Sequence, residues 1–481
     1  MNEPGEVTNV VDAFDDTNGN PFDLHLTLGY QHTIQNARIV RESYIGGNAN
    51  PSLTTGGFTS YMNVAKYQEV TSRLNMRADI GVYKDIALYI RMPLILSNTR
   101  ELTGVDGSDS QQAAILQGGY DGSTPQQLFS LPFKSPKRSG IEYLAFGLDF
   151  SLFNQFRDAS KPTWVFGAEV RLNVSEPMHA CKESAGPGVN LKNVQQVQCA
   201  DPSDVNRNGV ADGTNDGSFS GGRKPGVSRG TTGLEVHSII SRRIKYIEPY
   251  GGFRALFEFP TGSSDYGKSD LTAVLTSNPP LQGWMILGMQ VIPYEVRESF
   301  QRLTLDARFS GTYRSQGRDY TPLFDAIGSS DDQTVRRPSY ADYQLGPADA
   351  QGNRQSVVNP NSQKVYITGL TDTAAYGSLS FSGSAMFQAA EYIKFQLGMG
   401  YTYIQPHNIS GDQPCNPDFK NDVGNAGPCQ SKASTTGGST TSTVTGIPNP
   451  LYRPALDAVG RRFRMDQASQ IDIWVNAVVM F

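Results

Sequence analysis

The chain has 481 residues, of which 38% are hydrophobic, 18% are charged, 49 are glycine and 22 are tyrosine. Its 41 lysines and arginines against 46 acidic residues leave a formal net charge of -5, which offers no basic surface for DNA or RNA. No run of about 18 apolar residues occurs, so a transmembrane helix is excluded, and the composition is typical of long strands joined by polar loops.

An acidic N-terminal segment, residues 1–21, comes first. Its opening, MNEPGEV, lacks the basic start and apolar core of a signal peptide, which fits either a cytosolic protein or a mature chain with an added Met. The acidic side chains are irregularly spaced, which disfavours a calcium site there. We expect a flexible periplasmic tail that contacts a partner.

Twelve segments after this tail alternate apolar residues with other residues, and a period of two is typical of strands. The segments are 24–30, 74–82, 86–96, 144–152, 164–172, 234–240, 253–259, 285–291, 303–309, 379–387, 393–401 and 471–481. In the last segment, Ile471 and Ile473 share a face opposite Asp472 and Asn476. One apolar face and one polar face suit a strand between lipid and water, and this run is as long as the about 9–11 residues of a membrane strand. We therefore predict an all-β, transmembrane, antiparallel up-and-down barrel of twelve strands over residues 22–481, because closure leaves no exposed edge.

The connections between these segments alternate in length. Short connections are expected near 83–85, 157–162, 244–246, 293–297 and 389–391. Long connections are expected near 44–60, 104–140, 176–230, 261–282, 316–363 and 410–464. This asymmetry is typical of outer-membrane barrels, which have short periplasmic turns and long extracellular loops.

The four cysteines form two close pairs, Cys181 with Cys199 and Cys415 with Cys429, each inside a stretch rich in Gly, Asn and Pro. Local disulfides in exposed loops fit this spacing best and indicate an oxidising compartment. The alternative is two pairs of free thiols in a cytosolic protein.

A possible calcium loop lies between residues 204 and 216, with the pattern D-x-N-x-N-G-x-x-D. Calcium takes six to eight oxygen ligands, and Gly209 permits the sharp turn that lets them converge. The proposed ligands are Asp204, Asn206, Asn208, the Val210 carbonyl, Asp212 and Asp216. The twelfth position holds Asn215 and not the Glu of an EF-hand. The alternative is a solvated turn without metal, and no other cofactor is expected.

Charged residues recur on the faces opposite the apolar ones and are expected to point into the barrel. They are Arg73, Arg77, Asp79, Arg91, Asp149, Glu169, Arg171, Arg254, Glu258, Arg302, Asp306, Arg308, Lys394 and Asp472. Both signs are interspersed, so no ring of one sign is evident. Two interpretations stay open: a structural ion-pair network with little or no pore, or a narrow polar channel with Ser378 to Ser384 as a smooth wall.

Catalysis is not expected. A barrel hydrolase needs a nucleophile beside a base, and His237 and Ser238 are adjacent strand residues that point to opposite faces. A rim protease with Asp/His pairs is conceivable only through His179 or His407, which lie in or beside loops.

The C-terminal strand resembles the last strand of bacterial outer-membrane proteins. It ends in Phe481 and carries Val479, Ala477 and Val475 in the same phase. The resemblance implies that these residues are the signal read by the barrel-assembly machinery. The opening AFDDTNGNPFDLHLTLGY, an acidic tail that runs into the first strand, is similar to barrels of myxobacteria, some of which belong to gliding-motility complexes.

These observations predict a protein surrounded by the lipid of a bacterial outer membrane. We expect a porin-like, narrow polar conduit for small hydrophilic solutes. The alternative is a structural barrel with little or no conductance that anchors a multiprotein cell-envelope assembly, in gliding motility for example, through periplasmic or surface protein partners. No nucleic-acid partner is expected.

Overall fold

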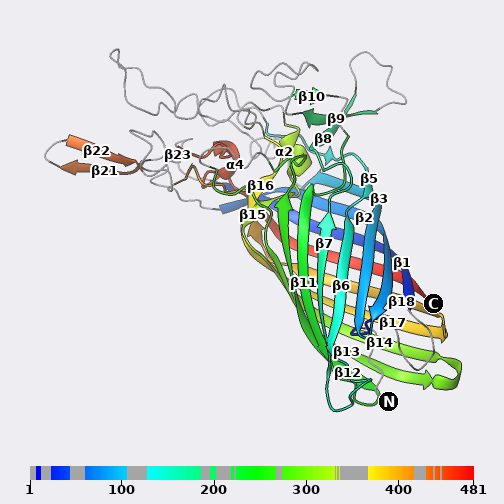
Figure 1. The fold of residues 1–481 in the computed structure, drawn as a ribbon. Coiled ribbons are helices and arrows are strands. Elements are labelled where there is room, and N and C mark those ends of the chain that lie inside the picture. The colour runs from blue at the N-terminus through cyan, green and yellow to red at the C-terminus, as the bar shows by residue number, and fades with distance from the viewer. Residues whose placement is uncertain are drawn as a thin grey trace.

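Twelve long strands form one closed antiparallel sheet in the computed structural model of the protein (Figure 1). The structure describes residues 7–11, 13, 23–43, 60–105, 127–185, 195–201, 218–220, 224–266, 274–330, 332, 335, 367–416, 430–436, 439–444 and 447–481. The barrel strands are β1 (Leu24–Ser43), β2 (Ser60–Tyr83), β3 (Ile86–Gly104), β6 (Leu144–Phe153), β7 (Thr163–Leu172), β11 (Thr231–Ser241), β12 (Ile247–Pro260), β13 (Gln282–Val296), β14 (Gln301–Arg314), β17 (Tyr376–Ala390), β18 (Ile393–Ile404) and β24 (Phe463–Met480). No helix among the described residues is long and apolar enough to cross a membrane.

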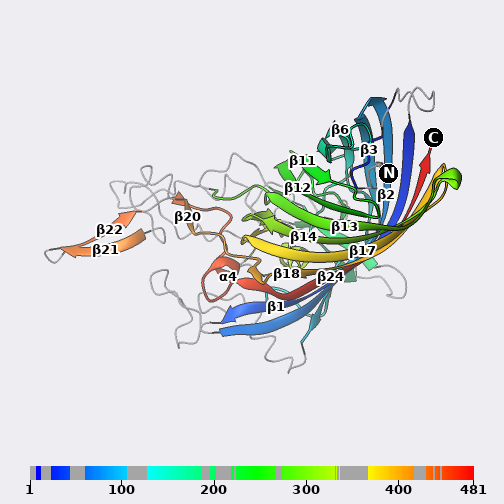
Figure 2. The same cartoon turned by 90° about the horizontal axis from the view of Figure 1, so that it is seen from below.

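The sheet closes where the first strand pairs with the last. β1 pairs with β2 on one side and with β24 on the other, so that Leu28 lies opposite Ala477. Figure 2 shows β24 running between β1 and β18, which are its two hydrogen-bonded neighbours. The predicted twelve-stranded antiparallel barrel is therefore confirmed, and each predicted segment lies in one of these strands, except that β24 ends one residue before Phe481.

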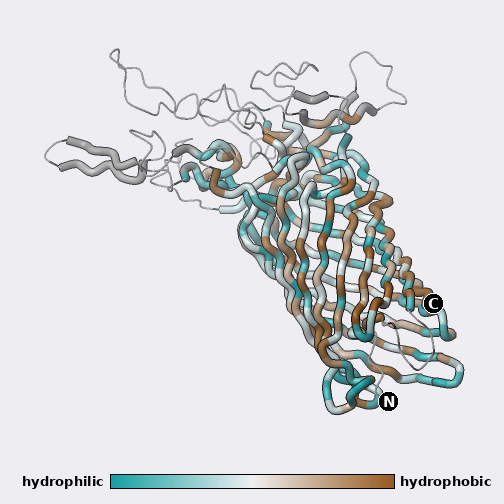
Figure 3. The backbone as a smooth tube through the Cα atoms, viewed as in Figure 1, coloured by the Kyte–Doolittle hydropathy of each residue, from teal (hydrophilic) through white to brown (hydrophobic). Residues whose placement is uncertain are grey.

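The outer face of the barrel is apolar. Along β18, Phe395, Leu397 and Met399 are exposed on the outside. Lys394, which precedes Phe395 and points to the other face, is buried inside. The same alternation recurs in the other strands and appears as brown residues along the wall in Figure 3. Since water does not solvate so much contiguous apolar surface, this band is the face that lipid covers.

The start of β1, the end of β24 and the short turns lie at one rim, the short-turn rim. Leu24 and Phe481 exchange two backbone hydrogen bonds there, of 3.1 and 2.9 Å. Thr8, from the N-terminal segment, is buried at the same rim and shares a 2.7 Å hydrogen bond with Ser241 at the end of β11. This part of residues 1–21 thus contacts the barrel itself.

The opposite rim, the loop rim, carries the small elements. They are β4 (Phe133–Lys134), β5 (Arg138–Ile141), β8 (Cys181–Ala185), β9 (Gln195–Asp201), β10 (Ser218–Ser220), β15 (Gly317–Asp319), α2 (Phe324–Gly328), β16 (Thr371–Thr373), β19 (His407–Asn408), β20 (Cys415–Asn416), β21 (Gln430–Thr436), β22 (Ser439–Val444), β23 (Ile447–Pro448) and α4 (Pro454–Asp457). The 3-10 turn η1 (Arg297–Ser299) belongs to the short-turn rim.

A compact apolar core, which we call the loop-end cap, fills the inner side of the wall near the loop rim. Leu323 and Ile327 of the α2 region and Leu456 of α4 pack against lumen-facing side chains such as Ile39 and Phe463. Long loops therefore fold back onto the barrel at this end.

Candidate functional site: the charged lumen

Ion pairs line the lumen along β2, β3, β6 and β7. Arg77 binds Asp79 at 2.6 Å on its own strand and Asp149 at 3.0 Å on β6. Farther along, Arg91 on β3 pairs with Glu169 on β7, which also accepts a 2.7 Å hydrogen bond from Arg171. These predicted lumen charges are therefore brought together across neighbouring strands.

Two residues of β11 extend this network and were absent from the predicted set. Glu235 pairs with Arg171 and with Arg254, the latter at 3.1 Å, and His237 hydrogen-bonds Asp149 at 2.9 Å. Both follow the lumen phase of β11, so the alternation with Leu234 and Val236 was the signal that could have found them. They connect the arginines into one continuous chain.

Tyrosine rings support several of these arginines. The guanidinium of Arg77 lies 3.9 Å from the centre of the Tyr89 ring. Tyr143 lies under both Arg91 and Arg171, at 5.5 and 5.0 Å. Stacking of this kind is favourable by about 0.5–1 kcal/mol or more, and it fixes the plane of each guanidinium.

The remaining predicted charges are distributed toward the rims and over β12 to β14. Tyr250 donates a 2.7 Å hydrogen bond to Asp306 and accepts one of 2.9 Å from Arg308. Further ion pairs join Arg73 to Glu142 at 3.0 Å, Glu258 to Arg229 at 3.0 Å, and Arg302 to Glu295 at 3.9 Å.

The other wall, formed by β17, β18, β24 and β1, is mainly neutral. Ser380 and Ser384 hydrogen-bond Thr402 and Gln396 across to β18, at 2.7 and 3.0 Å. Asp472 accepts hydrogen bonds from Thr33 at 2.6 Å and from Gln31 at 3.0 Å. Lys394 is buried on this wall. The lumen thus has a charged half and a polar, largely uncharged half.

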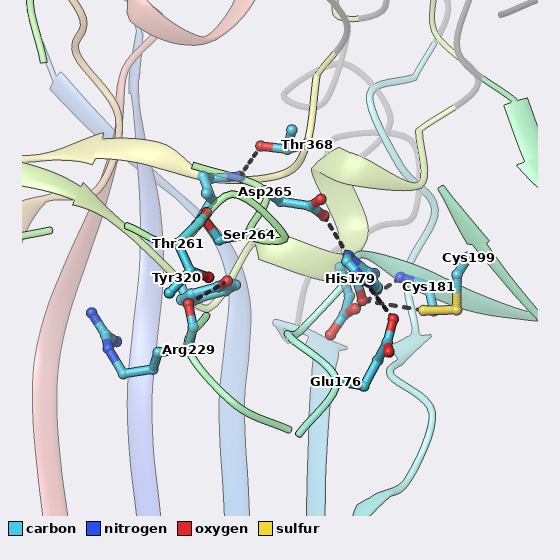
Figure 4. A network of polar contacts seen from close by, with 12 residues as sticks. Glu176, His179, Cys181, Cys199, Arg229, Thr261, Ser264, Asp265, Tyr320 and Thr368 are labelled. Atoms are coloured by element: carbon cyan, nitrogen blue, oxygen red, sulfur yellow. Dashed lines mark hydrogen bonds and ion pairs between the residues drawn. A yellow bond between two sulfur atoms is a disulfide. The ribbon is translucent and has the colours of Figure 1, made fainter. Parts of the chain in front are cut away.

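A clamp of buried polar groups holds the loop segment around His179 to the loop-end cap (Figure 4). His179 hydrogen-bonds Asp265 at 2.8 Å through Nδ1 and Glu176 at 3.2 Å through Nε2. The Asp325 carboxylate accepts two hydrogen bonds from the Arg138 guanidinium, at 2.9 and 2.6 Å, and a third of 3.0 Å from the Cys181 backbone amide. The His179 ring is almost fully buried, so this His/Asp pair has the environment of a structural contact.

The Cys181–Cys199 disulfide is confirmed and joins β8 to β9 beside this clamp. Cys429 lies outside the described residues, so its pairing with Cys415 stays a prediction. The calcium ligands proposed at Asp204, Asn206, Asn208, Val210, Asp212 and Asp216 also lie outside them, and calcium binding there stays a prediction.

Three acidic residues meet in the loop-end cap around one arginine. Arg318 binds Asp412 at 2.7 Å, and Asp457 accepts hydrogen bonds from the backbone amides of Gly411 and Arg453. Burial, and after it the negative charge of Asp412, raises the pKa of Asp372 to about 6 and raises the pKa of Asp457 in the same direction. Each of these two carboxyl groups is therefore easier to protonate than it is in water.

No family model matches the chain, and no curated protein matches it. Among solved structures, an outer-membrane channel from Pseudomonas putida F1 is 10% identical, with a TM-score of 0.36 over 100% of this chain and 99% of that one. A Pseudomonas aeruginosa FadL homologue is 8% identical, with a TM-score of 0.30 over 95% and 90%. The outer-membrane protease OmpT of Escherichia coli is 7% identical, with a TM-score of 0.24 over 98% and 100%. We draw no conclusion about function from similarities this low. Strand order, closure and the apolar outer face by themselves make the chain a β-barrel of the outer-membrane type.

Proposed function

We propose that the protein is a channel of the bacterial outer membrane that conducts small hydrophilic solutes through a narrow, charged lumen. The observation that carries this proposal is that lumen arginines stay open to water although they are paired. Arg77 keeps 35% of its side chain exposed and Arg254 keeps 38%. In a lumen packed with ion pairs, neighbouring side chains would cover these groups and leave them little exposed surface.

A second candidate is a structural barrel with little conductance that anchors a cell-envelope assembly. The loop-end cap favours it, because apolar side chains such as Leu323 and Phe463 fill part of the inner wall at the loop rim. Protein partners and recognition of Val475, Ala477, Val479 and Phe481 by the assembly machinery remain part of this proposal.

Conductance in planar lipid bilayers distinguishes the two candidates. A channel gives reproducible single-channel steps after insertion of the purified, folded protein. A barrel with only an anchoring role stays silent under the same conditions and is retained on its partners during purification. Arg77→Trp serves as the matched variant, since a bulky ring at this open lumen position should reduce the step size while the outer face stays unchanged.

A further inference from the structure

We propose that the lumen prefers anions, and that the transported solutes are small carboxylate-bearing molecules. This inference rests on the proposed channel function. The observation behind it is that the arginine side chains are more exposed to the lumen than the carboxylates with which they pair. The sequence shows both signs in nearly equal numbers, but the structure places them in different layers.

Across the middle of the barrel, each carboxylate lies behind its arginine. Arg91 is 25% exposed and its partner Glu169 is 1% exposed. Arg254 is far more exposed than Glu235, which is 3% exposed. The same order holds for Arg73 with Glu142, Arg171 with Glu169, and Arg308 with Asp306. Near the rims the pattern is mixed: Arg100 with Glu69 and Arg302 with Glu295 lack the difference. Arg229 with Glu258 and Arg462 with Glu42 retain it.

The buried carboxylates already use their hydrogen-bonding capacity on the wall. Glu169 and Glu235 each bind two arginines. An arginine has five N–H donors, so one or two bonds to the wall leave further donors for a solute. The tyrosine rings under Arg77 and Arg91 hold those donors in place.

The facing wall adds no competing stripe of negative charge. Ser380 hydrogen-bonds Thr402, Gln396 donates to Ser384, and the Asp472 carboxylate accepts hydrogen bonds from Thr33 and Gln31. A solute in mid-lumen therefore meets several guanidinium groups on one side. On the other side it meets hydroxyl and amide groups and the one hydrogen-bonded carboxylate of Asp472. The guanidinium groups match the two oxygens of a carboxylate.

The test is the reversal potential of single channels in a gradient of potassium chloride. A charge about 8 Å from an ion in water changes its local concentration about twofold, so three open arginines should favour chloride over potassium several-fold. The triple variant Arg77→Gln/Arg91→Gln/Arg254→Gln should lower this ratio to unity or below, because the wall carboxylates remain charged. Glu235→Gln should raise it, because a wall carboxylate is neutralised while the arginines remain. Sodium succinate should block the wild-type current and leave the triple variant unaffected.

A silent protein would refute the channel, and steady steps with potassium preference or with no preference would refute only the anion inference. A second readout applies even without current. Trp284 and Trp474 are lumen residues and Trp164 is on the outer face, so a Trp164→Phe background reports the lumen. With each quenching constant divided by that of free tryptophan, iodide should quench more strongly than caesium. Equal or reversed normalised quenching would overturn the inference. Arg157→Gln at a short turn, outside the lumen, is the folded control with unchanged selectivity.

Discussion

At the scale of single residues, the contact between Arg138 and Asp325 is the most buried ion pair of the loop-end cap. Their side chains are 0% and 3% exposed, and the two residues are 187 positions apart in the chain. Both charges are compensated by bidentate geometry and by the Cys181 amide. Removal of either partner of such a buried pair is strongly destabilising, because the remaining charge is left uncompensated.

We predict that Arg138→Ala lowers the free energy of unfolding of the cap by about 3–5 kcal/mol, the cost of stranding a buried carboxylate. Protease cleavage of the loops, with the barrel band on a gel as the fold control, measures the effect. Arg157→Ala, which breaks the more exposed pair with Asp85, should cost at most about 1 kcal/mol. Equal sensitivity of the two variants would contradict this account.

Two titrating groups in the cap act in opposite directions. Burial lowers the pKa of His407 to about 4, below its ordinary value, while the pKa of Asp372 is raised to about 6. For His407, stability is present at high pH and is lost as pH falls from about 6.5 toward 4, since the unfolded state binds the proton more tightly. For Asp372, stability is present at low pH and is lost as pH rises from about 4 to 6.

Variants at these positions should therefore change the pH dependence of the stability of the cap in opposite directions. His407→Gln leaves the carboxyl groups, so protection from protease should fall as pH rises from 4 to 7. Asp372→Asn/Asp457→Asn leaves His407, so protection should rise over the same range. The slope cannot exceed about 1.4 kcal/mol per pH unit for each proton. Parallel profiles for the two variants would exclude this assignment.

At the scale of the element, each strand separates two solvents. Leu397 is 58% exposed on the outer face of β18, and Gln396 beside it bonds Asn476 inside the barrel at 2.7 Å. Leu397→Arg should cost about 2–4 kcal/mol in lipid, whereas Gln396→Arg should cost clearly less because the lumen is wet. Unfolding of the two variants by guanidinium chloride in lipid vesicles measures the difference. A larger loss of unfolding free energy for Gln396→Arg would contradict the assignment of the inner and outer faces of β18.

The strands themselves could be predicted because a period of two is a local property, legible in β18 or β24 without any tertiary knowledge. The depth of charges could not be predicted. Glu169 and Arg171 lie in the same phase of one strand, and only neighbouring strands decide which of them is recessed. The loop-end cap was equally inaccessible, because Leu323 and Leu456 have no periodic pattern and meet through distant loops. The disulfide was predictable because Cys181 and Cys199 are close in sequence.

At the scale of the whole molecule, aromatic side chains gather at both ends of the apolar wall. Exposed aromatic residues at the short-turn rim are Tyr83, Phe156, Tyr246, Tyr294, Phe300, Tyr392 and Phe481. Those toward the loop rim are Tyr61, Phe259, Tyr313 and Tyr403. Two such girdles mark the membrane interfaces and hold the barrel at a fixed depth.

Phe481 belongs to this girdle and also closes the barrel through its backbone bonds to Leu24. We predict that deletion of Phe481 reduces the fraction of protein assembled in the membrane more than Phe300→Ala does, because the latter removes a girdle ring alone. The heat-sensitive gel shift of folded barrels measures that fraction. Comparable yields for the two variants would show that the terminal residue has no role beyond the girdle.

The seam between β1 and β24 has a consequence for biogenesis. The cap draws on Ile39 from the first strand and on Leu456 and Phe463 from near the end of the chain. Its apolar interior therefore cannot form before β1 and β24 are paired. Closure of the barrel and packing of the loop-end cap are then a single late event. A precursor in which β1 and β24 are not yet paired would expose the apolar loop residues of the cap to proteases. In the closed barrel these residues are buried.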